Sequence, residues 1–239
     1  MIMRTIHYHW RIHLLTALLA FGSISIALGA EPSEYILSNG MKVLLVEVPK
    51  APVATVQVWY KVGSRNEVMG RAGLSHMLEH MMFKGTARYP KGSFSRIVRK
   101  NGGIDNAFTG QDFTAYFENV AADRVGLALE LEADRMQGLL LDHSEFQTER
   151  DVVKEERRLR SEDDPQGALV EALFAQAFLS HPYHWPVIGW FADLDAMSLE
   201  DLQRHYDTFY SPNNATLVVV GDIKADALLP TIKRLFEPI

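Results

Sequence analysis

The sequence contains no cysteine among its 239 residues. This absence excludes a disulfide scaffold, a thiolate zinc site, an iron–sulfur cluster and a cysteine nucleophile. Low-complexity stretches and long linkers are also absent after residue 31. With 47% hydrophobic residues, the chain is expected to fold and to bury a sizeable core. Any metal site must therefore be built from histidine, aspartate or glutamate.

Positive charge is scarce, because 24 lysines and arginines stand against 30 aspartates and glutamates, a net charge of −6. The first thirty residues hold two arginines and no acid, so the remainder carries −6 − 2 = −8. An acidic balance of this size argues against a nucleic-acid partner.

The first thirty residues have the pattern of an export signal. Arg4 and Arg11 lie ahead of an apolar run that begins at Leu14, and the small residues Gly29 and Ala30 end it. This order predicts a cleaved signal over residues 1–30 and a periplasmic or secreted protein. The alternative is an uncleaved anchor, since the run from Leu14 has 17 residues, just enough to span a bilayer. A membrane association is expected only in that case.

Strand and helix patterns alternate along residues 31–239, which we expect to form the catalytic domain. Strands are expected around Asn39-Gly40 and at Val53–Val62, Ala107–Val120 and Leu217–Gly221. Helices are expected at Gly70–Lys84, Ser93–Lys100, Ala121–Gln137, Ser144–Arg160, Pro165–Leu179, Ser198–Tyr210 and Ala225–Phe236. This order predicts an α+β fold.

The segment His76–His80 concentrates the chemistry. Four helical residues turn through about 400°, so His76 and His80 share a face at the separation that suits two zinc ligands. Glu79 lies on the same side, and the order His-x-x-Glu-His is the inverted signature of a zinc peptidase. The alternative is a surface helix with two solvated histidines. The apolar neighbours of the motif argue against it, because they would bury the helix.

A catalytic zinc ion needs a third protein ligand, and spacing alone leaves its identity open. Glu149 and Glu156 are seven residues apart and would share a helix face, while Glu155 would point about 100° away. The same stretch fits a solvated helix face with internal ion pairs equally well. The other candidates are histidines outside the signal segment: His143, His181, His184 and His205.

The segment His76–Thr86, with Glu156 far along the chain, resembles the pitrilysin family of zinc metallopeptidases. That family includes insulin-degrading enzyme and the β subunit of the mitochondrial processing peptidase, and the likeness is closest to the processing-peptidase branch. The resemblance implies a sheet with helices packed on one side. It also implies one Zn²⁺ per chain, held by His76, His80 and Glu156.

The same resemblance assigns two further carboxylates and a substrate strand. Glu79 would be the base that activates water, and Glu149 an accessory carboxylate. The segment Gly102–Thr109 resembles the family's edge strand that pairs with the bound peptide. The implied substrate-binding residues are Gly103, Asn106, Ala107, Phe108 and Thr109. The glycines of this segment fit a simple helix C-cap equally well.

Family members pair this catalytic half with a second, similar half that closes a chamber around the substrate. The sequence stops at Ile239, soon after the first half, so we expect the second half to be absent from this chain. The expected partners are therefore a peptide substrate and a second half or partner subunit.

The sequence favours an exported zinc endopeptidase that acts on peptides or unfolded segments. The first alternative is a non-proteolytic peptide-binding or assembly subunit, against which the intact base and ligand set argues. The second is a zinc hydrolase of non-peptide substrates, which the metal chemistry would permit.

Overall fold

A six-stranded mixed sheet forms the centre of the computed structural model, which describes residues 31–239. The expected export signal lies outside the described residues. The strands are β1 (Ser33–Ile36), β2 (Lys42–Glu47), β3 (Val53–Tyr60), β4 (Ile104–Thr109), β5 (Thr114–Ala121) and β6 (Ala215–Gly221). Their order across the sheet is β1-β2-β6-β3-β5-β4, in which only β2 and β6 pair in parallel.

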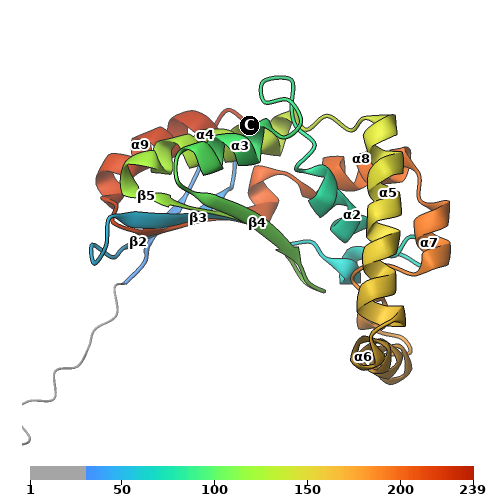
Figure 1. Ribbon diagram of the computed structural model, residues 1–239. Coiled ribbons are helices and arrows are strands. Elements are labelled where there is room, and N and C mark those ends of the chain that lie inside the picture. Colours follow the sequence, from blue (N-terminus) through green and yellow to red (C-terminus); the bar gives the residue numbers. More distant parts are fainter. Residues whose placement is uncertain (1–30) are drawn as a thin grey trace, which may run out of the picture. The chain divides into compact units, whose positions relative to one another are not determined.

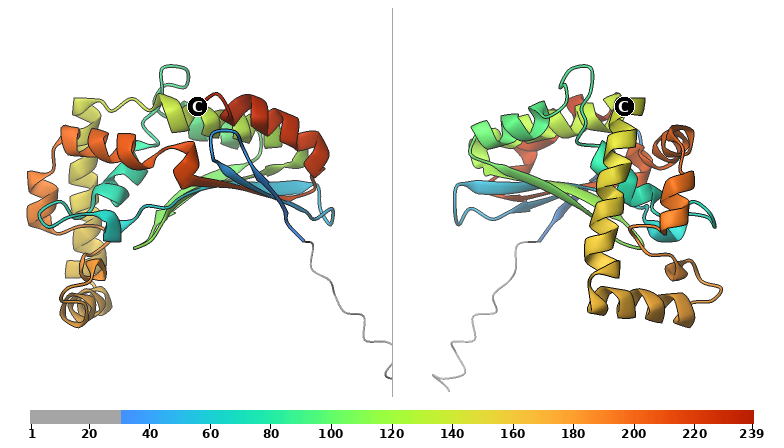
Figure 2. Two further views of the ribbon diagram at one scale, coloured as in Figure 1. Left: turned by 180° about the vertical axis from the view of Figure 1, so that it is seen from behind. Right: turned by 45° about the vertical axis from the view of Figure 1, so that its right-hand side comes forward.

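The helices pack on one face of the sheet and beside the ends of strands β3 and β4, as the α+β prediction requires. Helices α3 (Ser93–Lys100), α4 (Val125–Gly138) and α9 (Ala225–Phe236) cover one face, and in all three views no helix of the described residues lies over strands β1–β3 on the opposite face (Figures 1 and 2). Helices α2, α5, α7 and α8 form a second group, and α6 crosses the far end of α5 (Figure 1). The bounds of these five helices are α2 (Leu74–Met81), α5 (His143–Arg157), α6 (Pro165–Ala177), α7 (Phe191–Ala196) and α8 (Leu199–Phe209).

The sheet follows from period-two patterning in its central strands. Along β3 the side chains of Ala54, Val56, Val58 and Tyr60 are buried, while those between them are partly exposed. Strand β6 alternates in the same way. One face of the sheet therefore carries the core, and the other meets solvent.

The expected hairpin around Asn39-Gly40 is confirmed, because β1 and β2 pair antiparallel across a turn in which Gly40 has a φ of +87°. The sheet segment expected at Ala107–Val120 is two strands, β4 and β5, joined through residues 110–113. Helix α7 lies at the end of a region expected to be a loop. It has only 6 residues, too few to produce a clear helical period.

Helix α5 differs at both ends from the expectation of a helix from Ser144 to Arg160. Its N-cap is Asp142, whose side chain accepts the backbone N–H groups of Ser144 and Glu145. An N-cap aspartate accepts the N–H groups of the second and third helical residues, so the helix starts two residues before the expected serine cap. The regular helix ends at Arg157 and continues as a wider π-helical turn, Arg158–Glu162.

Residues Pro32–Ile239 form one compact unit. Within the described residues, the longest helices are too short or too polar to cross a lipid bilayer.

Candidate metal centre and active site

Helix α2 carries both histidines of the motif, and its start is defined by a glycine. Gly73 adopts a left-handed conformation, with a φ of +94°, and a Cβ at this position would lie 2.7 Å from the carbonyl oxygen of Ile188. A glycine is therefore required where the chain turns into the helix. One turn apart on α2, the rings of His76 and His80 have centroids separated by 4.7 Å.

Helix α5 brings a carboxylate against both imidazoles. Oε2 of Glu156 lies 3.6 Å from Nε2 of His76 and 3.3 Å from Nε2 of His80. One ligand atom from each of the three residues falls within 4.8 Å of the others. Tetrahedral zinc with bonds of about 2.0–2.1 Å places its ligand atoms roughly 3.3 Å apart. The two imidazoles and the carboxylate are thus spaced as ligands of one metal ion.

Hydrogen bonds and ion pairs to neighbouring side chains orient the three candidate ligands. Nδ1 of His80 donates to Oε1 of Glu149 at 2.9 Å, which turns Nε2 of the same ring toward Glu156. The other oxygen of Glu149 pairs with Lys84. Arg160 lies 3.0 Å from Oε1 of Glu156, the oxygen that faces away from the imidazoles. A carboxylate behind a histidine is the usual outer partner of a metal-bound imidazole.

The two imidazoles have opposite acid–base character. Burial, followed by the neighbouring His80, lowers the pKa of His76 to about 4, so this ring is neutral and can act as a ligand. Burial also acts to lower the pKa of His80, but hydrogen bonds to Glu149 and Glu156 outweigh it and raise the value to about 9. A metal ion would take the place of the proton that His80 carries between these carboxylates.

Glu79, the expected base, lies on α2 beside strand β4. Thr109 donates its hydroxyl to Oε2 of Glu79, and among residues 31–239 no side chain or backbone group donates to Oε1. Burial raises the pKa of Glu79, partly opposed by the hydrogen bond from Thr109. A carboxylate with a raised pKa is a better proton acceptor near neutral pH.

A cavity of about 840 Å³ opens over the three candidate ligands. Residues 105–109 of strand β4 line one side, and Val170 and Phe174 of helix α6 line another. Four of the five expected substrate residues, Asn106 to Thr109, therefore border the cavity. The cavity is large enough to hold several side chains of an extended peptide.

Gly103 does not line this cavity. It lies immediately before β4, where a Cβ would sit 2.9 Å from the carbonyl oxygen of Asn119 and from the side chains of Val98 and Val120. Close packing between α3 and β5 thus accounts for a glycine here.

The remaining candidate ligands lie elsewhere. Glu155 is exposed and pairs with Arg158. His205 is buried against Ser75, and Nδ1 of His184 contacts the carbonyl oxygen of Ala175. Among the described residues, His76, His80 and Glu156 are the only group with metal-binding geometry.

Three polar side chains at the site were not expected from the sequence as partners of these groups: Lys84, Thr109 and Arg160. Arg160 follows its partner Glu156 by four residues, and this helical spacing was the available signal for it. Lys84 pairs with Glu149, which is distant in the sequence, so it had no local signal. The contact between Thr109 and Glu79 joins a strand to a helix and has no local signal.

Comparisons with known proteins agree with the geometry. The profile of the insulinase family, peptidase family M16, matches residues 42–189, and that of the peptidase M16 inactive domain matches residues 196–239. The zinc protease PqqE of Helicobacter pylori is 42% identical over 204 residues, which are 85% of this chain and 46% of the relative. The chain spans about half the length of the curated relatives it matches.

Solved structures show the same fold. A protease from Helicobacter pylori superposes with a TM-score of 0.86 at 40% identity, covering 88% of this chain and 51% of the other. The periplasmic protease PqqL from Escherichia coli has a TM-score of 0.80 at 22% identity, covering 87% of this chain and 24% of that one. With its family profile matched over more than half its length, the chain belongs to the insulinase family, peptidase family M16.

Proposed function

We propose that this chain is the catalytic half of a zinc endopeptidase that hydrolyses peptides or unfolded polypeptide segments. The observation that carries the proposal is the convergence of His76, His80 and Glu156 from two helices, with Glu79 beside them. The donor set supports zinc, since two histidines and a glutamate are a known ligand set of catalytic zinc. The carboxylate of Glu149 behind His80 supports the same assignment.

One Zn²⁺ per chain would be held by His76, His80 and Glu156. When bound, zinc supplies Lewis acidity, which lowers the pKa of a water molecule and polarises a peptide carbonyl. Glu79 accepts the proton of the attacking water at Oε1, because Thr109 occupies Oε2. Glu79 then returns this proton to the leaving amine.

The substrate would bind in an extended conformation along strand β4, which lies at the edge of the sheet and, among the described strands, pairs with β5 alone. Backbone hydrogen bonds along residues 106–109 would give affinity, and the cavity would give selectivity for side chains. Peptides and unfolded segments fit this mode, because a folded protein rarely offers a free strand.

A second half or a partner subunit would complete the enzyme. The match to the M16 inactive domain begins at residue 196 and the relatives are about twice as long, which supports this arrangement. The pattern of residues 1–30 supports export to the periplasm or beyond.

The test is cleavage of an unstructured polypeptide with a quenched fluorophore by the zinc-loaded chain, alone and with a separately produced second half. Cleavage that is stronger with the second half and is lost in Glu79→Gln supports the proposal. Zinc binding without cleavage in either mixture would favour the non-proteolytic subunit. A chain that binds no zinc would refute the proposal.

A further inference from the structure

Helix α2 is capped by a carboxylate from outside the helix. Glu67 is buried, with 6% of its surface exposed, and it precedes the helix by several residues. Its Oε2 accepts the backbone N–H of Gly73 and its Oε1 accepts the backbone N–H of Ser75, both at 2.7 Å. One side chain thus satisfies two donors at the start of the helix.

This cap substitutes for one that the helix cannot supply. The N-cap residue is Gly73, which has no side chain, and the first N–H groups of a helix have no partner within it. Burial raises the pKa of Glu67 to about 8, so this side chain supplies the helix start with two hydrogen bonds rather than with a full negative charge.

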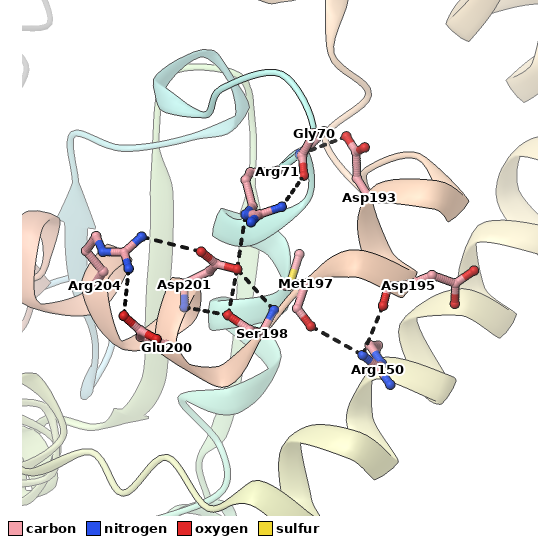
Figure 3. A network of polar contacts seen from close by, with 11 residues as sticks. Gly70, Arg71, Arg150, Asp193, Asp195, Met197, Ser198, Glu200, Asp201 and Arg204 are labelled. Carbon is pink, nitrogen blue, oxygen red and sulfur yellow. Dashed lines mark hydrogen bonds and ion pairs between the residues drawn. The ribbon is translucent and has the colours of Figure 1, made fainter.

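The chain between Glu67 and the helix is bound to the second helix group. The backbone N–H of Ala72 donates to Asp193 of α7 at 3.0 Å, and Nε of Arg71 lies 3.0 Å from Asp201 of α8. Figure 3 shows the pairing of Arg71 with Asp201, which also closes the N-terminal cap of α8 through Ser198. The start of α2 is therefore bound to two helices that carry none of His76, His80 and Glu156.

A further contact fixes the rotation of α2. The hydroxyl of Ser75, next to the candidate ligand His76, lies 3.1 Å from Nε2 of His205 on α8. Both residues are buried. The backbone and the side chain of Ser75 are thus held by different parts of the fold, Glu67 on one side and α8 on the other.

We propose that Glu67 is a positioning residue for the metal centre. By fixing the start of α2, it places the imidazoles of His76 and His80 opposite Glu156, and its removal loosens the ligand set without touching a ligand. This inference rests on the proposed zinc site.

The chain offers a matched control for the test. Glu47, on strand β2, also caps a helix, α9: its Oε1 accepts one backbone N–H, that of Ala225 at 2.9 Å, and its Oε2 pairs with the side chain of Lys224. Helix α9 carries none of the candidate site residues. Glu67→Gln and Glu47→Gln thus make the same chemical change at two helix starts, one near the site and one remote.

The experiment measures zinc affinity of the full chain by competition with a chromophoric chelator, together with the visible absorption of the cobalt-substituted protein. We expect Glu67→Gln to weaken zinc binding by about 10-fold, the lower end of the loss seen when a direct hydrogen-bond partner of a ligand is removed, and to alter the cobalt spectrum. Glu47→Gln is expected to change neither. Equal affinity and equal spectra for Glu67→Gln and the unaltered chain would overturn the inference.

A second measurement needs no variant and decides the question if Glu67→Gln fails to fold. Thermodynamic coupling is reciprocal. If the hydrogen bonds of Glu67 raise the affinity for zinc by a given factor, zinc binding should stabilise these hydrogen bonds by the same factor. We expect amide hydrogen exchange at Gly73 and Ser75 to slow about 10-fold on adding zinc, and exchange at Ala225 to stay unchanged. Zinc binding without such slowing would refute the inference alone, whereas no zinc binding would refute the proposed function.

Discussion

Replacing three glutamates of helix α5 one at a time by glutamine should produce three different losses of zinc affinity. Glu156 faces both imidazoles, at 3.3 and 3.6 Å, and would lose a direct ligand. Glu149 contacts Nδ1 of His80 and would lose an outer partner. Glu155 is exposed and, in the part of the chain that the structure describes, pairs with Arg158 and not with a candidate ligand, so its change should have no effect.

The expected magnitudes follow from these positions. Loss of an outer partner of a ligating histidine costs about 10- to 100-fold in metal affinity, or about 1.4–2.7 kcal/mol. We assign this range to Glu149→Gln. Glu156→Gln should exceed about 100-fold, because a neutral amide replaces a charged ligand. The unfolding temperature of the metal-free variants separates these effects from a loss of folding.

The assay is titration of each variant with zinc against a chelator at fixed pH. The order of affinities should be Glu155→Gln, equal to the unaltered chain, then Glu149→Gln, then Glu156→Gln. A loss in Glu155→Gln, or a greater loss in Glu149→Gln than in Glu156→Gln, would refute the assignment of the third ligand.

Three further predictions test other parts of the structure. Glu79→Gln should keep zinc and lose about 10²- to 10⁴-fold of peptide hydrolysis, and loss of the metal instead would make Glu79 a ligand. Burial lowers the pKa of His205 from 6.5 to about 4. Between pH 6.5 and pH 4 the imidazole is therefore protonated in the unfolded state and neutral in the folded state. The stabilisation that comes from keeping this ring neutral is fully present above pH 6.5. The free energy of unfolding should therefore fall by about 3 kcal/mol as the pH drops from 6.5 to 4. Urea titrations at several pH values should show that His205→Gln lacks this part of the pH dependence of the free energy of unfolding. The same pH dependence in the variant and the unaltered chain would contradict the prediction. In Gly189→Ala a Cβ would lie 2.4 Å from the carbonyl oxygen of Ala72, at a φ of +85°. Thermal unfolding should show a destabilisation of about 1–3 kcal/mol, whereas Gly126→Ala, in open space on α4, should be neutral or stabilising.

Local geometry was enough to predict part of the candidate site. The separation of His76 and His80 is a property of any α-helix, and so is the placement of Glu79 beside them. The choice between Glu155 and Glu156 depends on how α5 is rotated against α2, which is a matter of tertiary packing.

A signal for that rotation is present in the sequence. Phe146 and Val153 are fully buried on α5, and they recur with Glu149 and Glu156 at intervals of three and four residues. The apolar positions therefore mark the face that carries the two glutamates. The spacing of the carboxylates alone could not show this.

The less predictable features involve contacts between distant segments. The contact of Thr109 with Glu79 and the cap supplied by Glu67 join parts of the chain that no local periodicity relates. Helix α7 was not predicted, because it is short and follows an aromatic loop with two prolines. The central strands and longer helices were predicted because their burial patterns extend over many residues.

The central claim is that one zinc ion lies between α2 and α5. Anomalous diffraction from crystals of the zinc-loaded chain, recorded on both sides of the zinc absorption edge, tests it directly. We predict one peak per chain, about 2 Å from Nε2 of His76, from Nε2 of His80 and from a carboxylate oxygen of Glu156. A zinc peak elsewhere, or none at this position in a zinc-loaded crystal, would contradict the claim.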